Sequence, residues 1–246
     1  MPIRAVIFDV GGTLIYPVVD PLRILNDAGF AIEPHVFSAA LRRTFNEHFW
    51  PRTGRDLDMW GDDDLIRTYW RGFYAHLFSL LGLPEEAWTA LADRIQDHYW
   101  QPDGWTPFPE THTVLEQLKA AGFILGALSD WNSQLPRILD HLDLHAYFDF
   151  VVVSALHGVG KPSPLLFDIA LRRSGVRAEE AIYVGDTYMT DIMGARASGL
   201  HPVLIDRSQR PAPADCDVIR SLDELLPLLR RLNGREAKAA KSEDTQ

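Results

Sequence analysis

The chain has little cysteine, no long apolar run and no excess of positive charge. Its single cysteine among 246 residues, Cys216, excludes an internal disulfide, so we expect a reducing, cytoplasmic location. No apolar run approaches the length that crosses a membrane. The first apolar segment begins within a few residues, so we expect no secretory signal. A net charge of −10 argues against nucleic acid or an anionic membrane as partner.

The chain does contain apolar runs that alternate with helical patterns. The runs predict strands over 4–10, 123–130, 148–155, 181–186 and 202–206, and a weaker one over 217–222. Helical patterns lie over 110–121, 164–174 and 190–198, and each stops at a glycine. Ser163 and Pro164 give the second helix an N-cap and a first residue. This alternation predicts an α/β fold with a doubly wound parallel sheet.

Between residues 17 and 104 the pattern is helical only. Four amphipathic helices are expected there, and helices of this length form a small bundle. We therefore expect a core made of residues 1–16 and 105–233, with 17–104 inserted as a helical domain. The crossings at residue 17 and at the proline-rich segment 101–109 predict two hinges on which the insert moves as a lid. The polar segment 234–246 has no apolar period, and we expect it to be disordered.

Polar residues follow several of the predicted strands. Asp9 lies near the end of the first, directly after the apolar run 5–8, Ser129 and Asp130 end the second, and Asp186 ends the fourth. Active sites of open parallel sheets lie at these strand ends, so we expect the side chains to meet there. Each segment alone also fits an ordinary turn or helix cap. Together with Lys161 they supply the acids, cation and hydroxyl that bind a phosphate through a divalent metal.

The order of these segments is similar to the motifs of a known superfamily. Asp9, Ser129, Lys161, the pair Gly185-Asp186 and Asp191 resemble the four motifs of the haloacid dehalogenase-like hydrolases. The resemblance extends from residue 3 to about residue 232, with the insert in the position of that superfamily's first type of cap. It implies a Rossmann-like core with a helical cap, and a phosphatase acting on a small phosphorylated metabolite.

The resemblance assigns a nucleophile and a metal site. Asp9 would attack the phosphorus and form an aspartyl-phosphate, which divides one difficult step into two. Mg²⁺ prefers oxygen ligands, and Asp9 and Asp186 would supply two of them. The superfamily adds the main-chain carbonyl of Gly11. Asp191 would bind the ion directly or through water, or orient its neighbours.

The same resemblance assigns the phosphate contacts. Lys161 would offset the charge of nucleophile and phosphate as the transition state forms. The hydroxyl of Ser129 and the backbone N–H of Asp130 would hold one phosphate oxygen, with Gly12 beside them. Thr13 would support the turn.

Two positions depart from the superfamily pattern. Phosphatases of the superfamily usually carry an acid–base aspartate where this chain has Gly11. Because such assistance contributes about 10²–10⁴-fold, we expect slow turnover of alkyl phosphates and smaller losses for acyl or aryl phosphates. Gly11→Asp should then raise alkyl phosphate turnover, unless an acid of the insert or Tyr16 substitutes. Asp130 stands where asparagine is usual, and we expect its carboxylate to point away from the phosphate.

Three functions remain open from the sequence. The first is a Mg²⁺-dependent phosphohydrolase. The second is a 2-haloacid dehalogenase, which uses the same aspartate without metal, and which Asp186 and Asp191 argue against. The third is a binding protein that has lost turnover. The substrate and the oligomeric state are not specified.

Two further features of the insert have plain structural explanations. The acids 62–64 are expected to cap a helix rather than bind metal. The aromatic residues of the insert are expected to form its core rather than a ligand site.

Overall fold

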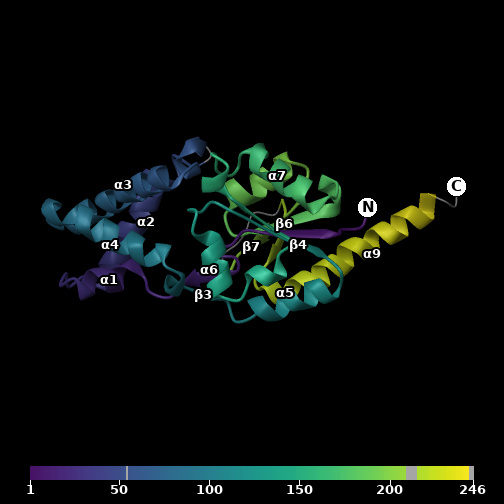
Figure 1. Ribbon diagram of the computed structural model, residues 1–246, viewed down its shortest axis with the longest axis horizontal. Helices are drawn as coiled ribbons and strands as arrows, with labels where there is room; N and C mark the ends of the chain where they lie inside the picture. The colour runs from purple at the N-terminus through teal and green to yellow at the C-terminus, as the bar shows by residue number, and fades with distance from the viewer. Residues whose placement is uncertain (54, 209–214, 244–246) are drawn as a thin grey trace.

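The computed structural model describes residues 1–53, 55–208 and 215–243, and side chains up to residue 234. Its centre is a parallel sheet of six strands in the order β5-β4-β1-β6-β7-β8 (Figure 1). The strands are β1 Ala5–Phe8, β4 Ile124–Ser129, β5 Phe150–Val153, β6 Ala181–Gly185, β7 His201–Ile205 and β8 Asp217–Ile219. Strand β1 is central, with every residue buried and β4 and β6 as parallel neighbours. The predicted parallel α/β fold is confirmed.

Helices cover both faces of this sheet. Figure 1 shows α7 on one side and α5 and α9 on the other. The bounds are α5 Thr111–Ala120, α6 Leu135–His141, α7 Pro164–Ser174, α8 Met193–Ala197 and α9 Leu225–Glu243. One apolar cluster joins the sheet to α5, α6 and α9, and a second joins it to α7 and α8. Helix α6 was not predicted, because its apolar pattern spans only seven residues.

The end of the chain differs from the expected disorder over 234–246. Helix α9 continues as far as Glu243, and residues 244–246 lie outside the described part. The segment from 235 to 243 is rich in Ala, Glu and Lys, which have high helix propensity and can extend a helix without an apolar face.

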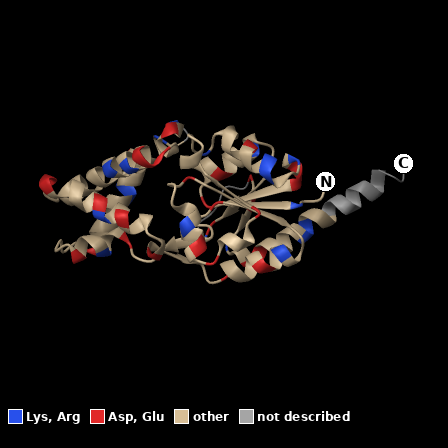
Figure 2. Ribbon diagram, in the orientation of Figure 1, with Lys and Arg blue, Asp and Glu red and all other residues tan. Residues whose placement is uncertain are grey.

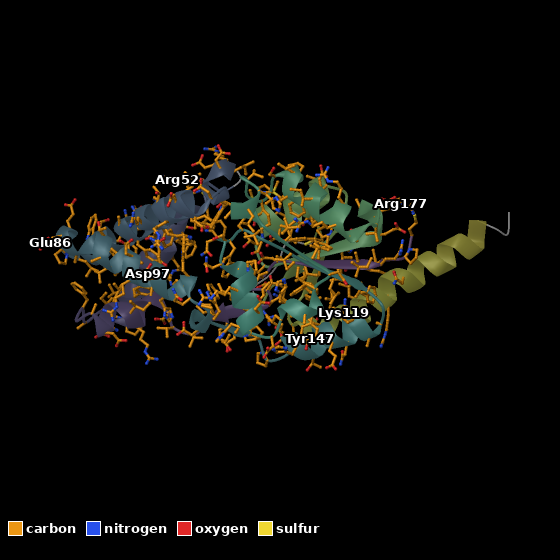
Figure 3. The ribbon with its side chains drawn as sticks, in the orientation of Figure 1. Arg52, Glu86, Asp97, Lys119, Tyr147 and Arg177 are labelled. Atoms are coloured by element: carbon orange, nitrogen blue, oxygen red, sulfur yellow. The ribbon has the colours of Figure 1, made fainter. Side chains whose placement is uncertain are left out.

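The inserted residues form their own helical body at one end of the molecule (Figure 1). Its helices are α1 Pro21–Asp27, α2 Pro34–Thr44, α3 Asp63–Leu81 and α4 Trp88–Trp100. Short helical turns lie between or after them, at η1 Phe45–Phe49, η2 Leu57–Trp60, η3 Glu85–Ala87 and η4 Pro102–Gly104. Phe73, Leu77, Phe78 and Ile95 are the centre of an apolar cluster distinct from those of the sheet. Acidic and basic residues are interspersed along the helices of insert and core (Figure 2). Among the labelled side chains, Glu86 and Asp97 lie on the insert, and Lys119 and Arg177 on the core (Figure 3).

The two chain crossings between core and insert pair with each other. Strand β2, Ile15–Pro17, runs antiparallel to β3, Trp105–Pro107, with Tyr16 opposite Thr106. The sequence predicted two hinges here but no strands, because three residues ending in proline carry no periodic signal.

Helix ends follow the predicted chemistry with one exception. Asp62 caps α3 by accepting a hydrogen bond of 2.8 Å from the backbone N–H of Leu65, which confirms the capping interpretation for that residue. Ser163 does precede α7, but its side chain makes no cap hydrogen bond. Within the described residues, no helix combines the length and apolarity needed to cross a bilayer.

Candidate active site

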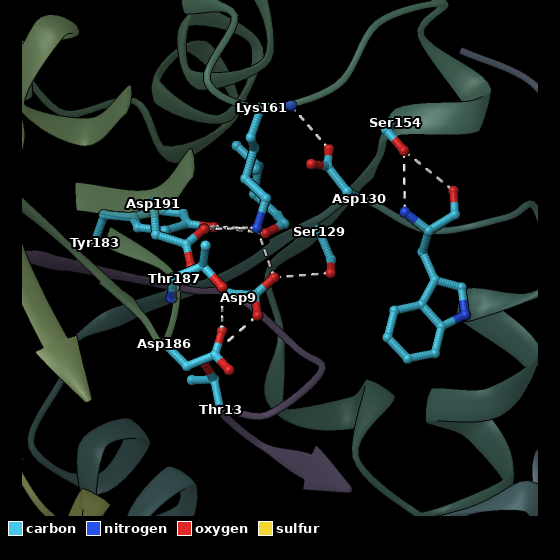
Figure 4. A network of polar contacts seen from close by, with 12 residues as sticks. Asp9, Thr13, Ser129, Asp130, Ser154, Lys161, Tyr183, Asp186, Thr187 and Asp191 are labelled. Atoms are coloured by element: carbon cyan, nitrogen blue, oxygen red, sulfur yellow. Dashed lines mark hydrogen bonds and ion pairs between the residues drawn. The ribbon is translucent and has the colours of Figure 1, made fainter. Parts of the chain in front are cut away.

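The site is built where the three central strands end. Asp9 directly follows β1, and its backbone N–H donates to the carbonyl of Val184 in β6 at 2.8 Å. Ser129 ends β4, and its hydroxyl donates to Oδ1 of Asp9 at 2.8 Å. Asp186 follows β6. Because β1 lies between β4 and β6, the parallel register brings these residues together, as Figure 4 shows.

Lys161 reaches this point from the loop after β5. Its Nζ lies 2.7 Å from Oδ1 of Asp9 and 2.7 Å from Oδ1 of Asp191. It also lies 3.2 Å from the hydroxyl of Tyr183. Burial alone would lower the pKa of Lys161, but the carboxylates of Asp191 and Asp9 raise it well above its usual value. The site therefore contains a buried cation that stays charged at physiological pH.

Three carboxylates share the same space. Asp9, Asp186 and Asp191 each offer an oxygen, and these oxygens all lie within 4.8 Å of one another. Partial loss of hydration, together with the charges of Asp9 and Asp191, raises the pKa of Asp186 to about 7, although the residue still reaches solvent. Burial is also the main cause of the raised pKa of Asp191. Such crowding of carboxylate oxygens fits the donor set that Mg²⁺ prefers.

Asp191 is the most constrained of the three acids. It lies in a helical turn, η8 Tyr188–Ile192, which begins the region predicted as helix over 190–198 and leads into α8. Its Oδ1 accepts from Lys161, and its Oδ2 accepts from the backbone N–H of Thr187 at 2.9 Å. Both oxygens are engaged, so the carboxylate fixes the position of the Lys161 ammonium.

The turn after Asp9 contains a glycine at a position where any side chain would be strained. Gly12 has φ +75°, and a Cβ there would lie 2.2 Å from Oδ2 of Asp186. The hydroxyl of Thr13 lies 3.5 Å from Oδ2 of Asp9. The carbonyl of Thr13 accepts a hydrogen bond of 2.9 Å from Arg207. Gly12 therefore allows the close approach of the two acids, and Arg207 holds the turn from behind.

Gly11 lies under an aromatic ring. It lines the cleft at the strand ends, and a Cβ at this position would lie 2.9 Å from Cζ3 of Trp131. Trp131 in turn packs on Trp105, with ring centroids 4.6 Å apart. The indole of Trp131 thus occupies the space that a side chain at position 11 would need.

Asp130 is bound by the loop that carries Lys161. Its Oδ1 accepts a hydrogen bond of 2.8 Å from the backbone N–H of Lys161. Burial raises the pKa of Asp130 to about 7, against the opposing effect of the Lys161 charge. The residue also borders the cleft at the strand ends, so one oxygen is engaged by the loop while the residue remains part of the cleft wall.

The cleft has a volume of about 390 Å³ and two kinds of wall. One wall is formed by the polar residues at the strand ends. The other comes from apolar residues of the insert, which are Phe45, Phe49, Met59, Trp60 and Trp70. The insert therefore covers the polar site with aromatic rings.

Two polar contacts join the insert to the core beside this cleft. The backbone N–H of Gly160 donates to the carbonyl of Leu57 at 2.9 Å. Asp63 accepts from the backbone N–H of Ser133 at 2.7 Å and from its hydroxyl at 2.5 Å. The acids 62–64 thus do more than cap a helix, because Asp63 bonds across to the core.

Removing the Asp63 contact is expected to loosen the insert. Asp63→Ala deletes two hydrogen bonds to a carboxylate, each contributing about 1.5–3 kcal/mol, and should increase acrylamide quenching of tryptophan fluorescence by exposing Trp60 and Trp131. Asp64→Ala is the control, since Asp64 is exposed in the same helical turn and removes an equal charge from the helix N-terminus. Equal quenching in the two variants would show that the Asp63 contact does not hold the insert.

Several residues of the site were not predicted from the sequence. Tyr183 could have been predicted as a site residue, because its hydroxyl is the one polar side-chain group in the apolar run 181–184. That hydroxyl donates to the carbonyl of Leu128 at 2.9 Å and lies beside Lys161. Trp131 and the pair Asp63 and Ser133 gave no signal, since their partners are distant in sequence.

Comparisons with known proteins agree with this geometry. The family model described as haloacid dehalogenase-like hydrolase matches residues 3–199. A mouse protein named haloacid dehalogenase-like hydrolase domain-containing protein 3 is 30% identical over 210 residues, covering 82% of each chain. Glyceraldehyde 3-phosphate phosphatase of Methanopyrus kandleri is 31% identical over 242 residues, covering 94% of this chain and 98% of that protein.

A solved structure gives a different activity for a similar fold. The 2-haloacid dehalogenase of Pseudomonas syringae pv. Tomato DC3000 superposes with a TM-score of 0.60 at 26% identity. The match covers 94% of this chain and 99% of that one. Because relatives of both activities match most of the chain, the choice between these activities must come from the side chains.

Proposed function

Since the chain belongs to the haloacid dehalogenase-like hydrolases, we propose that it is a cytoplasmic, Mg²⁺-dependent phosphatase acting on a small phosphorylated substrate through Asp9. The observation that carries the proposal is the cluster of Asp9, Asp186 and Asp191 beside Lys161. A dehalogenase has no phosphate charge to neutralise and no use for three crowded carboxylates. The similarity to a phosphatase over nearly the whole chain supports the same choice.

The chain's own residues perform the first step. Oδ1 of Asp9 is held by Ser129 and Lys161, which leaves Oδ2, with its single long contact to Thr13, to attack the phosphorus. The P–O bond to the leaving group breaks as the bond to Asp9 forms. With Gly11 in place of an acid, the leaving oxygen departs as an anion. Lys161 and the N–H of Asp130 stabilise the negative charge of the phosphoryl oxygens.

The second step returns the enzyme to its initial state. Water attacks the phosphorus of the aspartyl-phosphate, inorganic phosphate leaves, and the Asp9 carboxylate is restored. The insert, residues 17–104, serves as a cap over the core formed by 1–16 and 105–233, and its aromatic wall excludes bulk water from the reacting groups. In a drier cleft the attraction between Lys161 and the phosphoryl oxygens is stronger.

The metal would be held by the acids of the strand ends. Asp9, Asp186 and the carbonyl of Gly11 would ligate Mg²⁺, and Asp191 would contribute its charge and orient Lys161. When bound, the ion neutralises part of the charge of phosphate and nucleophile.

Mg²⁺ binding is expected to strengthen as the pH rises from 6 to 8. Asp186, with a pKa of about 7 in the metal-free protein, is mostly protonated at pH 6 and must lose that proton to bind the ion. The Mg²⁺-dependent rise in Tm should therefore be larger at pH 8 than at pH 6. Asp186→Asn should abolish the rise at both values, and Asp168→Asn, an exposed change on α7, should preserve it. An equal rise at both pH values would contradict the assignment.

An activity panel separates the candidate functions. The purified protein is tested with p-nitrophenyl phosphate, acetyl phosphate and 2-chloropropionate, each in Mg²⁺ or in EDTA. We expect phosphate release that requires Mg²⁺. Release of chloride in EDTA would identify a dehalogenase instead. If neither phosphate nor chloride is released from any substrate while Mg²⁺ still raises the Tm, the chain is a binding protein.

A further inference from the structure

A second cavity lies behind the catalytic cleft, between the insert and the core. It has a volume of about 350 Å³, and we call it the aromatic chamber. It shares wall residues with the cleft, among them Trp60, Trp70, Trp105, Asp130 and Trp131. The two spaces therefore adjoin at the end of β4. An engineered cavity of about 150 Å³ binds benzene, so the aromatic chamber is large enough for a bicyclic ring.

The walls of the chamber select an uncharged, aromatic group. Its sides are rings from the insert and the core, and the described residues that line it include no Lys or Arg. A second phosphate or a carboxylate would therefore find no cation there. Flat rings on several sides favour stacking with another ring. Trp70 packs against the core cluster of the insert, as expected for its aromatic residues, and Trp70 and Trp100 also line this chamber.

One buried polar group in the chamber wall has no partner. Gln96 of α4 is 2% exposed and lines the chamber. Neither its amide oxygen nor its amide nitrogen has a hydrogen-bond partner among the described residues. An unpaired buried amide destabilises a protein, whereas a ligand with a hydroxyl or carbonyl would satisfy it. The wall is thus mostly apolar, with Asp130 and Asn132 of the core also lining it, and Gln96 is its buried amide without a partner among the described residues.

The chemistry of the leaving group agrees with the shape of the chamber. Residue 11 is a glycine with Trp131 packed against it, so the cleft has no acid at that position to protonate a departing alkoxide. A phenolate is a stable anion and departs without a proton. Building on the proposed phosphatase function, we propose that the aromatic chamber holds the leaving group of an aryl phosphate whose ring carries a hydroxyl or carbonyl that bonds to Gln96.

The kinetic test compares substrates that differ by one hydroxyl. The wild type should hydrolyse 6-hydroxy-2-naphthyl phosphate with a kcat/KM about tenfold above that of 2-naphthyl phosphate, as one hydrogen bond to a buried amide allows. In Gln96→Leu this ratio should fall to about one. Acetyl phosphate, too small to reach the chamber, reports on the catalytic cleft alone, and the naphthyl rates are normalised to its rate in each protein. Gln117→Leu, on the exposed face of α5, should keep the tenfold ratio.

A binding test separates this inference from the phosphatase function. Calorimetry in EDTA should detect 2,6-dihydroxynaphthalene binding to the wild type and about tenfold weaker binding to Gln96→Leu. Turnover of acetyl phosphate with no naphthyl preference and no such binding would overturn the chamber assignment alone. Binding that depends on Gln96, with no phosphate release from any substrate, would overturn the phosphatase function and with it the assignment to a leaving group.

Discussion

Asp9→Asn is expected to reduce phosphate release by about 10⁴-fold or more, the scale of loss when a nucleophile is removed. An amide is a poor nucleophile, while its oxygen can still accept the hydrogen bonds of Ser129 and Lys161. The variant should therefore fold normally and lose turnover. The measurement is kcat with acetyl phosphate in Mg²⁺, together with the thermal unfolding transition.

Covalent labelling distinguishes a nucleophile from a residue that only binds metal. Wild-type protein quenched in acid during turnover should carry phosphate that is released by base, and Asp9→Asn should carry none. Asp191→Asn is the informative companion, because it alters the surroundings of Lys161 and leaves Asp9 in place. We expect weak labelling of that variant. Labelled Asp9→Asn protein would place the nucleophile elsewhere.

Gly11→Asp alone is expected to lower the Tm and to leave alkyl phosphate turnover low. The new Cβ would lie 2.9 Å from the indole of Trp131, which is itself packed against Trp105. This outcome differs from the gain that the sequence alone predicted. When the ring is also removed, in Gly11→Asp/Trp131→Ala, the carboxyl has room, and hydrolysis of 2-glycerophosphate should exceed that of Trp131→Ala by about 10²-fold or more.

Four proteins complete this experiment as a double-mutant cycle. The wild type, the two single variants and the double variant are assayed with 2-glycerophosphate and with phenyl phosphate. Phenyl phosphate should gain little from the new acid, since its leaving group needs no proton. A rise in glycerophosphate turnover in Gly11→Asp alone, with an unchanged Tm, would show that the ring of Trp131 moves away to make room for the new side chain.

The sequence predicted the parts of the site that single strands carry. Asp9, Ser129 and Asp186 each end an apolar run, and parallel pairing then requires their ends to meet. Lys161 was found by its motif, not by periodicity, and lies in the same place. The sheet order was not readable from the sequence, because pairing between distant strands leaves no local pattern.

The unpredicted features have one physical origin. Trp131 opposes Gly11 across 120 residues, and Ser133 bonds to Asp63 across 70 residues. The first contact joins two segments of the core and the second joins insert to core, so both arise only in the folded protein, and no spacing rule connects the partners. In the sequence Gln96 is likewise one polar residue of a predicted helix. Its place in the wall of the chamber is seen only in the folded structure.

The pairing of β2 with β3 has a consequence for how the molecule can change. Pro17 and Trp105 lie opposite each other in that ribbon, so the backbone leaves the sheet layer and re-enters it at a single spot. A short turn could join residue 17 directly to residue 105 and leave the six-stranded core sheet without the insert. We therefore expect that the bundle, with its aromatic lining, can be exchanged for another while the carboxylates at the strand ends keep their positions.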